Sequence, residues 1–430
     1  MARKEHAAWT PSASRPDPIA LLEASSVGRV PRLIPVRYGR MLKSPFAFLR
    51  GGPSIMAGDL GTATPVSGLR VQACGDCHLE NFGVFATPER NLIFDINDFD
   101  ETLVAPWEWD LKRLAASIHV AGRTIGVAEP ACTLAVKAAA RAYRERLALC
   151  AQMTALEVWY SRIEAKTLVK RTPIAELSRA RTKRNKAAPD HTHQSVAERF
   201  TEGEGSTRRI AERPPLIYHL PDGDDDIAHS HRTLEHYRES LRDDVKVLFD
   251  RYTVVDFAVK VVGLGSVGTR CSMTLLTASN EDCLILQVKE ARASTLEPYA
   301  GKSPYDNHGR RIVAGQQLMQ AASDIFLGWT KSGDGREYFV RQLADMKASV
   351  EVATMRARDI AEYAALCGHV LAIAHARSGD AGCISGYLGK SALFDGAIAR
   401  FARSYADQVE ADYERFLQAA KAGVIRADPD

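Results

Sequence analysis

The acidic stretch at residues 74–110 constrains this chain more than any other segment. It reads CGDCHLENFGVFATPERNLIFDINDFDETLVAPWEWD. In order, it holds a loop in which Asp76 stands five positions before Asn81, two short apolar runs around a proline-containing turn, and an acid-rich turn. Because Asp, Asn and Gly tolerate unusual backbone angles, turn formation explains each feature singly. It does not explain why a strand-like run, a D-x-x-x-x-N loop, a hairpin pattern and an acid-rich turn follow in this order.

This order suits phosphoryl transfer. In that chemistry one carboxylate orients a hydroxyl group, while an amide and a second carboxylate hold magnesium. We therefore expect Asp76 to orient the attacking hydroxyl, and Asn81 and one downstream aspartate to bind Mg²⁺. Asp95 directly follows the apolar run LIF, and Asp98 lies in the acid-rich turn. The spacing leaves both aspartates open as the metal ligand.

The segment GLGSVG is the second feature that carries chemistry. Its loop residues are Gly263, Gly265, Ser266 and Gly268. In a dinucleotide-binding unit such glycines open a helix, whereas in a kinase they join two antiparallel strands and a lysine lies on the third. Residues 269–277 alternate and are β-prone, and Lys289 lies in the apolar run LILQVKEA. A buried lysine needs an anion, and a nucleotide phosphate supplies one, so we expect a phosphate-covering loop.

The hydrophobic periodicity predicts a mixed α+β chain. We expect strands or hairpins at 68–73, 82–86, 92–96, 253–291 (three antiparallel strands) and 325–343, and helices at 106–126, 130–153, 157–165, 234–252, 311–322, 350–377 and 392–420. These elements predict four parts: a flexible arm at 1–20, a helical lobe with the catalytic loop and metal-binding hairpin at 21–250, a β-rich nucleotide-binding lobe at 251–348, and C-terminal helices completing the helical lobe at 349–430.

The overall composition limits the classes of binding partner and the cellular location that we expect. A formal charge of +3 over 430 residues is close to neutral and gives no support for nucleic-acid or membrane binding. No run of about 18 apolar residues occurs, so we expect no transmembrane helix. The N-terminal sequence MARKEHAAWTPSASRPDP has no apolar core like that of a secretory signal, and we expect a cytoplasmic location.

Three segments also carry a family resemblance. GDCHLENFG, FDINDFDE and PWEWDLKRLAAS closely resemble the bacterial domain of unknown function 2252 family, over nearly the whole chain. They look like the GDLHPGN, IDFDD and YDLA signatures of aminoglycoside and choline kinase-like enzymes. The resemblance implies that Asp76 is the catalytic aspartate, that His78 stabilises its loop, and that Asp110 is a helix aspartate bracing that loop.

The same resemblance assigns the nucleotide side. It implies that Asn81 with Asp98 or Asp95 binds magnesium, that the GLGSVG loop covers the nucleotide phosphates, and that Lys289 pairs with a phosphate. The helix expected at 311–322 has no glutamate to pair with that lysine. The candidate substitutes are Gln316, Gln317 and Glu290.

The order of the segments departs from a kinase, because the glycine-rich loop and the lysine follow the catalytic loop. Cutting a kinase-like fold just before its catalytic loop and joining the old ends gives this order, and chains tolerate such permutation at exposed sites. We therefore expect a bilobal, circularly permuted, protein-kinase-like fold, with a small antiparallel β lobe at about 250–345 on a mostly helical lobe. Lys289 and Asp98 or Asp95 should then face one cleft.

The expected function is an ATP- and Mg²⁺-dependent phosphotransferase whose partners are a nucleotide and a hydroxyl-bearing acceptor. The sequence defines neither the acceptor nor the oligomeric state. The alternatives are a nucleotidyl transferase that moves AMP on the same scaffold, a non-catalytic nucleotide-binding pseudokinase and, ranked last, a Rossmann oxidoreductase.

Overall fold

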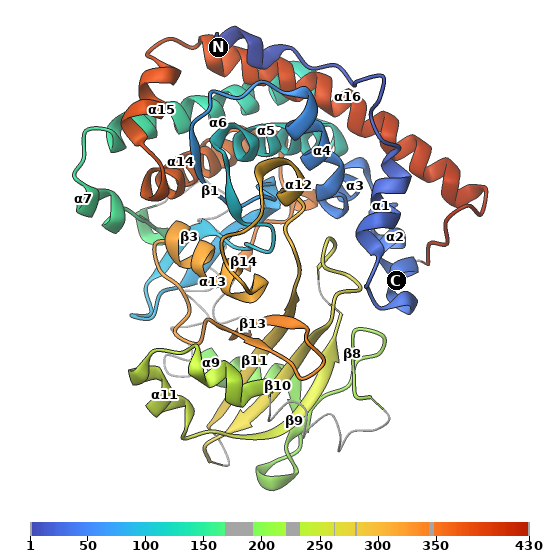
Figure 1. The fold of residues 1–430 in the computed structure, drawn as a ribbon. Helices are drawn as coiled ribbons and strands as arrows, with labels where there is room; N and C mark the ends of the chain where they lie inside the picture. The colour runs from blue at the N-terminus through green and yellow to red at the C-terminus, as the bar shows by residue number, and fades with distance from the viewer. Residues whose placement is uncertain are drawn as a thin grey trace.

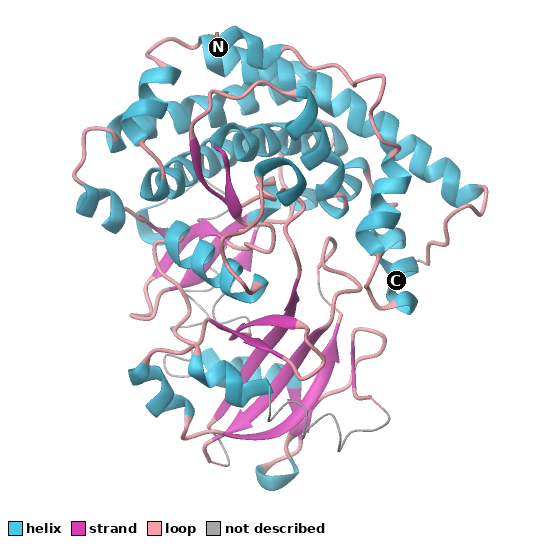
Figure 2. Cartoon of the chain, in the orientation of Figure 1, coloured by secondary structure: helices cyan, strands magenta, loops and turns pink. Residues whose placement is uncertain are grey.

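The computed structural model describes residues 2–167, 192–220, 233–261, 263–279, 282–343 and 348–428. In this part of the chain most helices gather in one region and a large antiparallel sheet forms another (Figures 1 and 2). The structure is therefore α+β with antiparallel sheets, as the periodicity predicted.

Helix α5 (Trp107–Thr124) lies at the centre of the helical region, because residues 107–122 are all buried. A helix buried on every side has to be covered by other helices. Helices α6 (Glu129–Cys150), α14 (Ile360–Ser378) and α16 (Leu393–Lys421) provide this cover (Figure 1). The other helices of this region are α1 (Pro18–Ser26), α2 (Ile34–Met41), α3 (Pro45–Gly51), α4 (Pro53–Ala63), α7 (Ala155–Tyr160) and α15 (Ala381–Leu388).

The largest sheet has the strand order β12-β13-β11-β10-β9-β8, and every neighbouring pair is antiparallel. Its strands are β8 (Ile217–Tyr218), β9 (Thr253–Lys260), β10 (Cys271–Thr277), β11 (Cys283–Ala291), β12 (Gly328–Lys331) and β13 (Glu337–Gln342). Helix α9 (Thr192–Phe200) packs on one face, and residues 234–249, with α11 (Asp243–Phe249), pack on the other. Both faces are covered, which agrees with the nearly continuous burial of β10 and β11.

Smaller sheets lie on the helical side. The hairpin β2 (Phe82–Ala86) and β3 (Leu92–Ile96) is extended by β14 (Ala348–Ser349) and β5 (Ile163–Glu164), and β1 (Arg70–Ala73) pairs with β4 (Leu103–Pro106). A third small sheet, β6 (Thr201–Glu202) with β7 (Arg209–Ile210), lies instead beside β9 of the large sheet. Helices α12 (Glu297–Ala300) and α13 (His308–Met319) connect β11 to β12.

Several predicted elements are confirmed. The β2–β3 hairpin has the predicted bounds, and β9, β10 and β11 are the three antiparallel strands with the glycine-rich segment between the first two. The β12–β13 hairpin and helices α5, α6, α13 and α16 also match, with ends that shift by a few residues.

Three predicted helices are wrong in part. In the segment 157–165, α7 ends at Tyr160 and β5 pairs with β3, because Ile163 supplies an apolar strand residue to the hairpin edge. In 350–377, α14 starts only at Ile360, after two short 3-10 helices. The segment 234–252 is interrupted before α11. Within residues 192–220 and 233–249, β8 is a strand of the large sheet, and α9 and α11 pack on that sheet.

Residues 2–20, for which we expected a flexible arm, pack against the helical region. His6 and Trp9 are buried, and Trp9 contacts Tyr405 of α16 edge to face. The Arg15 guanidinium joins Asp59 and Asp412 through ion pairs of 2.7 and 2.6 Å. Aromatic burial and a paired arginine hold this segment, and its proline-rich composition did not reveal either contact.

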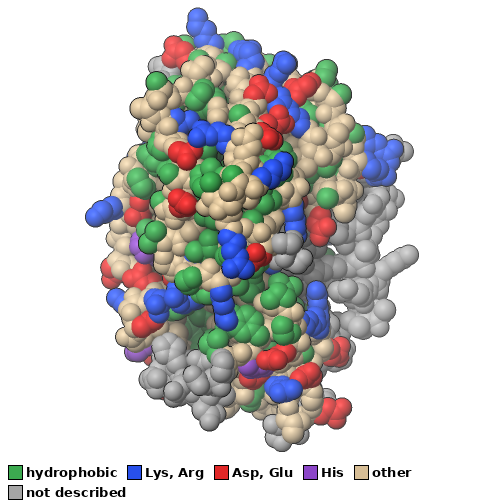
Figure 3. Space-filling view, turned by 90° about the vertical axis from the view of Figure 1, so that its right-hand side faces the viewer, with side chains coloured by type: hydrophobic (Ala, Val, Ile, Leu, Met, Phe, Trp, Pro, Cys, Tyr) green, Lys and Arg blue, Asp and Glu red, His purple; other side chains and the backbone are tan. Residues whose placement is uncertain are grey.

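The surface mixes both charges. On the face shown in Figure 3, basic and acidic side chains are interspersed, in keeping with the formal charge of +3. Within the described residues, no helix combines the length and the apolar content required to cross a bilayer.

The contact between α6 and α14 depends on a glycine, and this can be tested by mutation. A Cβ at Gly368 would lie 2.2 Å from the carbonyl oxygen of Ala139, whereas a Cβ at Gly386 of α15 would meet no atom within 4 Å. We expect Gly368→Ala to destabilise the protein by about 1–3 kcal/mol through overpacking. Gly386→Ala is the matched control and should stabilise it by about 0.5–1 kcal/mol. Urea unfolding of both variants measures the effect, and equal shifts would contradict this packing.

Candidate active site

Asp110 in the first turn of α5 fixes the backbone that leads to Asp76. Its carboxylate is 1% exposed and accepts hydrogen bonds from the backbone N–H groups of Cys74 (2.7 Å) and Gly75 (3.0 Å). Nε2 of His375 on α14 lies 3.1 Å from the same carboxylate. A carboxylate in the first helical turn also interacts favourably with the helix dipole. The loop that carries Asp76 is thus bound to two buried helices.

Arg113 holds one oxygen of Asp76. It lies one helical turn after Asp110, and its Nε and Nη2 atoms lie 2.8 and 2.6 Å from Oδ1 of Asp76. Oδ2 lies 4.0 Å from Nε2 of His78, beyond hydrogen-bonding distance. Burial raises the pKa of Asp76, and Arg113 opposes this shift. One carboxylate oxygen is therefore fixed while the other is left to a ligand.

His78 is a neutral imidazole in this setting. Burial, followed by the positive charges of Arg50 and Arg113, holds the pKa of His78 well below its ordinary value of 6.5. Its position beside Asp76 fits the loop-stabilising role that the resemblance implies, and it brings no positive charge to the site.

Asn81 joins the loop of Asp76 to the acid-rich turn. Its Nδ2 donates to the carbonyl oxygens of Asp76 (3.1 Å) and Asp98 (3.0 Å), and its Oδ1 accepts from the N–H of Asp98 (2.8 Å). The side chain is 4% exposed. Its oxygen keeps a second lone pair, so the predicted role as a magnesium ligand stays open.

Lys289 on β11 meets the acid-rich turn although the two are far apart in the chain. Its side chain is 4% exposed, its Nζ lies 3.6 Å from Oδ2 of Asp98, and it forms a closer ion pair with Asp100. Burial lowers the pKa of Lys289, but the carboxylates of Asp100 and Asp98 more than offset this and leave it raised. Burial and then the Asp98 carboxylate raise the pKa of Asp100 to about 6, against the effect of Lys289. We call these three residues the ion cluster.

Asp95 has a different environment. Its carboxylate accepts hydrogen bonds from the N–H groups of Ile96 and Ala321, both at 2.9 Å. Burial raises its pKa, and the charge of Arg377 opposes the shift. Asp95 therefore anchors the backbone that follows α13, and of the two predicted metal ligands only Asp98 is placed with Lys289.

The acid-rich turn is also held by hydrogen bonds to the segment between β11 and β12, in each of which one partner is charged. Arg311 of α13 donates to the carbonyl oxygens of Asp100 (2.8 Å) and Thr102 (2.5 Å). The carboxylate of Glu101 accepts from the N–H (2.6 Å) and the hydroxyl (3.0 Å) of Thr295. These bonds hold the turn in place independently of the ion cluster.

The glycine-rich loop connects β9 to β10 and reaches the ion cluster. Gly263 and Gly268 have φ angles of +68° and +89°, a region that favours glycine. The hydroxyl of Ser266 donates to Oδ2 of Asp100 at 3.2 Å. Because an antiparallel strand follows Gly268, the loop does not have the strand-to-helix geometry of a dinucleotide-binding unit.

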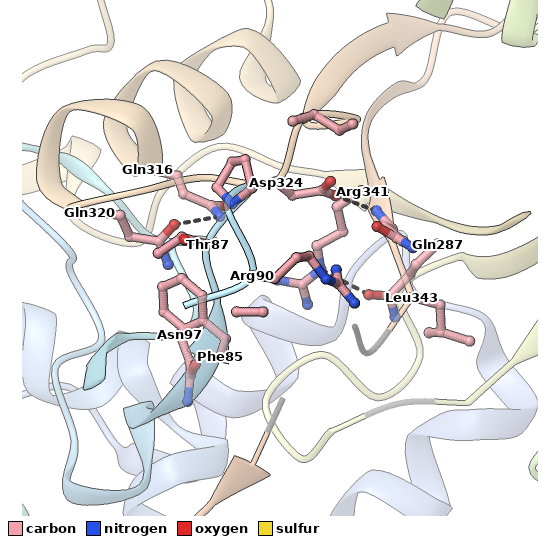
Figure 4. A pocket seen from close by; sticks show the side chains of 14 residues that line it. Phe85, Thr87, Arg90, Asn97, Gln287, Gln316, Gln320, Asp324, Arg341 and Leu343 are labelled. Carbon is pink, nitrogen blue, oxygen red and sulfur yellow. Dashed lines mark hydrogen bonds between the residues drawn. The ribbon is translucent and has the colours of Figure 1, made fainter. Parts of the chain in front are cut away.

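A cavity of about 240 Å³ is lined by Asn97, the residue before Asp98, and by Gln287 of β11, among other residues (Figure 4). Its lining comes from the turn between β2 and β3, from β11, from α13 and from the end of β13. Gln287, two residues before Lys289 on the same face of β11, accepts a hydrogen bond of 3.0 Å from Nε of Arg341. Gln316 of α13 and Gln320, which directly follows this helix, form a second pair at 2.9 Å. The cavity is thus lined by groups that both donate and accept hydrogen bonds.

None of the predicted substitutes for a helix glutamate pairs with Lys289. Gln316 bonds to Gln320, Gln317 is exposed, and Glu290 pairs with Arg270. Asp100 takes this position instead. The acid-rich turn was recognised in the sequence, but three-dimensional placement was needed to select Asp100 from it.

Arg113 and His375 were not predicted as site residues. Arg113 lies three positions after Asp110 and so on the same helix face, a spacing that could have identified it. His375 lies in the distant segment LAIAHA and carries no such signal.

The carboxylates of the site can be compared with the ligands that Mg²⁺ requires. Within the described residues, no group of three or more His, Cys, Asp or Glu side chains is arranged to hold a metal. Mg²⁺ in nucleotide sites needs only one or two carboxylates, since phosphates and water complete its shell. Asp98 and Asp100 fit that requirement, because both place a carboxylate next to Lys289.

The fold and the site together define an α+β protein with a glycine-rich loop, a buried lysine and an acidic cluster where its two regions meet. A family profile described as an uncharacterized protein conserved in bacteria (DUF2252) matches residues 29–419. The chain belongs to this family, so the resemblance of GDCHLENFG, FDINDFDE and PWEWDLKRLAAS to the domain of unknown function 2252 family is confirmed. Comparison with curated proteins found no match, and comparison with solved structures found none.

The ion cluster predicts how stability depends on pH. Asp100 ionises near 3.8 when unfolded and near 6 when folded, so the folded state retains a proton between these values. As the pH rises through this window, the free energy of unfolding of the wild type therefore falls relative to that of Asp100→Asn, by at most about 3 kcal/mol. Urea unfolding at a series of pH values from about 4 to about 7 measures the difference.

Asp244→Asn provides the control of opposite sign. Its partner Arg242 lowers the pKa of the exposed Asp244 carboxyl, so the wild type should gain stability over this variant as the pH rises. Parallel pH profiles for wild type and Asp100→Asn would contradict the assignment of a raised pKa to Asp100.

Proposed function

We propose that this protein is an ATP- and Mg²⁺-dependent phosphotransferase with a kinase-like arrangement of parts. The single observation that carries this proposal is the ion cluster, in which Lys289 of the sheet meets Asp98 and Asp100 of the acid-rich turn beneath a glycine-rich loop. Kinases place a lysine and a metal-binding aspartate at the triphosphate in this way.

The order of elements supports the same proposal. Along the chain, the elements of this region follow in the order β9, glycine-rich loop, β10, β11 with its lysine, α13, β12 and β13. A kinase nucleotide lobe likewise has its loop between the first two strands, its lysine on the third and a helix after it. The D-x-x-x-x-N loop, the β2–β3 hairpin and the acid-rich turn come earlier in the chain, which fits a circularly permuted bilobal fold.

The nucleotide would lie between the two regions. In this proposal the ammonium of Lys289 moves from the aspartates to the phosphates, which releases Asp98 and Asp100 to bind Mg²⁺. The base would lie in the cavity that is lined by Gln287, Arg341 and other polar groups. Gln287 stands two residues before Lys289 on β11. Lys289 is then paired with the two aspartates when the site is empty and with the phosphates when the nucleotide is bound, and Mg²⁺ is paired with the aspartates.

Asp76 would orient the acceptor. Its Oδ1 is held by Arg113, and its Oδ2 is positioned to accept the hydroxyl proton as the oxygen attacks phosphorus. A positioned carboxylate of this kind contributes about 10²–10⁴-fold to a rate. Because burial raises the pKa of Asp76, it is a better proton acceptor than an exposed carboxylate.

The two predicted metal ligands provide the test. We expect Asp98→Asn to weaken Mg²⁺-dependent ATP binding at least about tenfold, or about 1.4 kcal/mol, because it removes a ligand. Asp95→Asn is the matched control and should leave the affinity within about twofold, since Asp95 binds backbone N–H groups. Isothermal titration calorimetry with and without Mg²⁺ measures both, and thermal unfolding confirms that the variants are folded.

The outcomes separate the candidate functions. Wild-type protein that binds no ATP in the presence of Mg²⁺ would reject the proposal, as would equal effects of the two variants. Asp76→Asn should keep the affinity and abolish turnover. Mass spectrometry of the product distinguishes phosphate from AMP, and intact binding without turnover in the wild type would favour a pseudokinase.

A further inference from the structure

The last turn of α3 supports the glycine-rich loop. A Cβ at Gly265 would lie 3.3 Å from the carbonyl oxygen of Arg50, and a Cβ at Gly51 would lie 2.7 Å from Cδ2 of Leu264. The tip of the loop therefore rests on Arg50 and Gly51. This contact joins the basic segment RYGRMLKSPFAFLRGG to the part of the site that would hold phosphates.

The side chain of Arg50 points toward the catalytic loop. Its Nη1 forms an ion pair with Oε2 of Glu80, and its guanidinium lies 5.7 Å from the centre of the Phe46 ring. The other oxygen of Glu80 accepts a hydrogen bond of 2.8 Å from the N–H of Val352. Glu80 is thereby fixed, and it fixes Arg50 in turn.

Arg50 is also a neighbour of Asp76. Arg113, which holds Asp76, donates from Nη2 to the carbonyl oxygen of Leu49 at 2.9 Å. The charge of Arg50 is among those that lower the pKa values of Asp76 and His78. Arg50 therefore contacts the tip of the glycine-rich loop through its backbone, and its side-chain charge acts on Asp76.

The guanidinium of Arg50 has donors to spare. Within the described residues its only hydrogen-bonding or ionic partner is Glu80, and its buried Nε has no acceptor. The side chain is 27% exposed. By contrast, Arg29 and Arg40 donate to the carbonyl oxygens of Val267 and Gly263, both at 2.6 Å, and so hold the loop from outside. Arg50 has the position and the open donors of a group that binds an anion inside the site.

We propose that Arg50 is a catalytic residue that binds the phosphoryl group in transit between the nucleotide and the acceptor. The inference rests on the proposed phosphotransferase function and adds an arginine supplied by the chain itself. In the step, the acceptor oxygen forms a bond to the terminal phosphorus, and the phosphorus–oxygen bond to the β-phosphate breaks. The electron pair of that bond stays on the nucleoside diphosphate, and the hydroxyl proton passes to Asp76.

The chemistry favours arginine at this point. Negative charge in the transition state is spread over the equatorial oxygens of the transferring group, and a planar guanidinium binds two such oxygens at once. A lysine presents a single compact charge and does not reproduce that geometry. Glu80 acts as a positioning residue, because it fixes the guanidinium without contacting the reacting atoms.

The test uses ADP, Mg²⁺ and aluminium fluoride, which together mimic the transferring phosphoryl group and require no knowledge of the acceptor. We expect the wild type to bind ADP more tightly when fluoride is present. Arg50→Ala and Arg50→Lys should bind ADP within about twofold of the wild type but lose at least about tenfold of the fluoride-dependent gain. Intrinsic ATP hydrolysis should fall by about 10³-fold. Arg141→Ala, which removes an exposed arginine of α6, is the control and should change neither quantity.

The possible results separate a failure of the role proposed for Arg50 from a failure of the proposed phosphotransferase function. Wild-type protein that binds neither ADP nor ATP with Mg²⁺ would overturn both. Wild-type protein that binds ADP with no gain from fluoride, or a gain that survives in Arg50→Lys, would overturn the role of Arg50 and leave nucleotide binding standing. Thermal unfolding checks each variant, and if Arg50→Ala fails to fold, Arg50→Lys, which keeps the charge, decides the question.

Discussion

The ion cluster of Lys289, Asp98 and Asp100 is the interaction on which the arrangement of the two regions depends. Burying an ammonium group costs several kcal/mol unless carboxylates compensate it. Lys289 is 3% exposed, so its strand holds this position only with the acid-rich turn beneath it. Hydrogen bonds from the Arg311 guanidinium to backbone carbonyl oxygens then fix the turn. The same charges are the ones that a magnesium nucleotide needs, so one set of residues serves both the fold and the proposed ligand.

The acidic side chains in the segment 74–110 fall into two groups according to the contacts that they make. Asp110 and Asp95 accept hydrogen bonds from backbone N–H groups and act as structural anchors. Asp76 has one oxygen held by Arg113 and one turned to a ligand, while Asp98 and Asp100 face Lys289. In the proposed function the first group builds the site and the second performs its chemistry.

The sequence predicted local structure well because its signals were local. The β2–β3 hairpin and the strands around the glycine-rich loop follow from apolar runs and turn residues. Asp100 was not selected because the choice among neighbouring aspartates depends on a lysine far along the chain. The basic segment that contains Arg50 was interpreted as a solvated helix face, because the proposed role of Arg50 depends on a contact with Gly265. The packing of Trp9 was missed for the same reason.

The central claim is that Lys289 lies at the phosphates of a bound nucleotide, and it can be tested chemically. An ATP analogue with an acyl group on its terminal phosphate transfers that group to a lysine placed beside the phosphates. Digestion and mass spectrometry of the labelled protein then locate the modified residue. The account predicts that Lys289 is acylated and that excess ATP with Mg²⁺ prevents it. Labelling confined to exposed lysines such as Lys166, and unaffected by ATP, would contradict the claim.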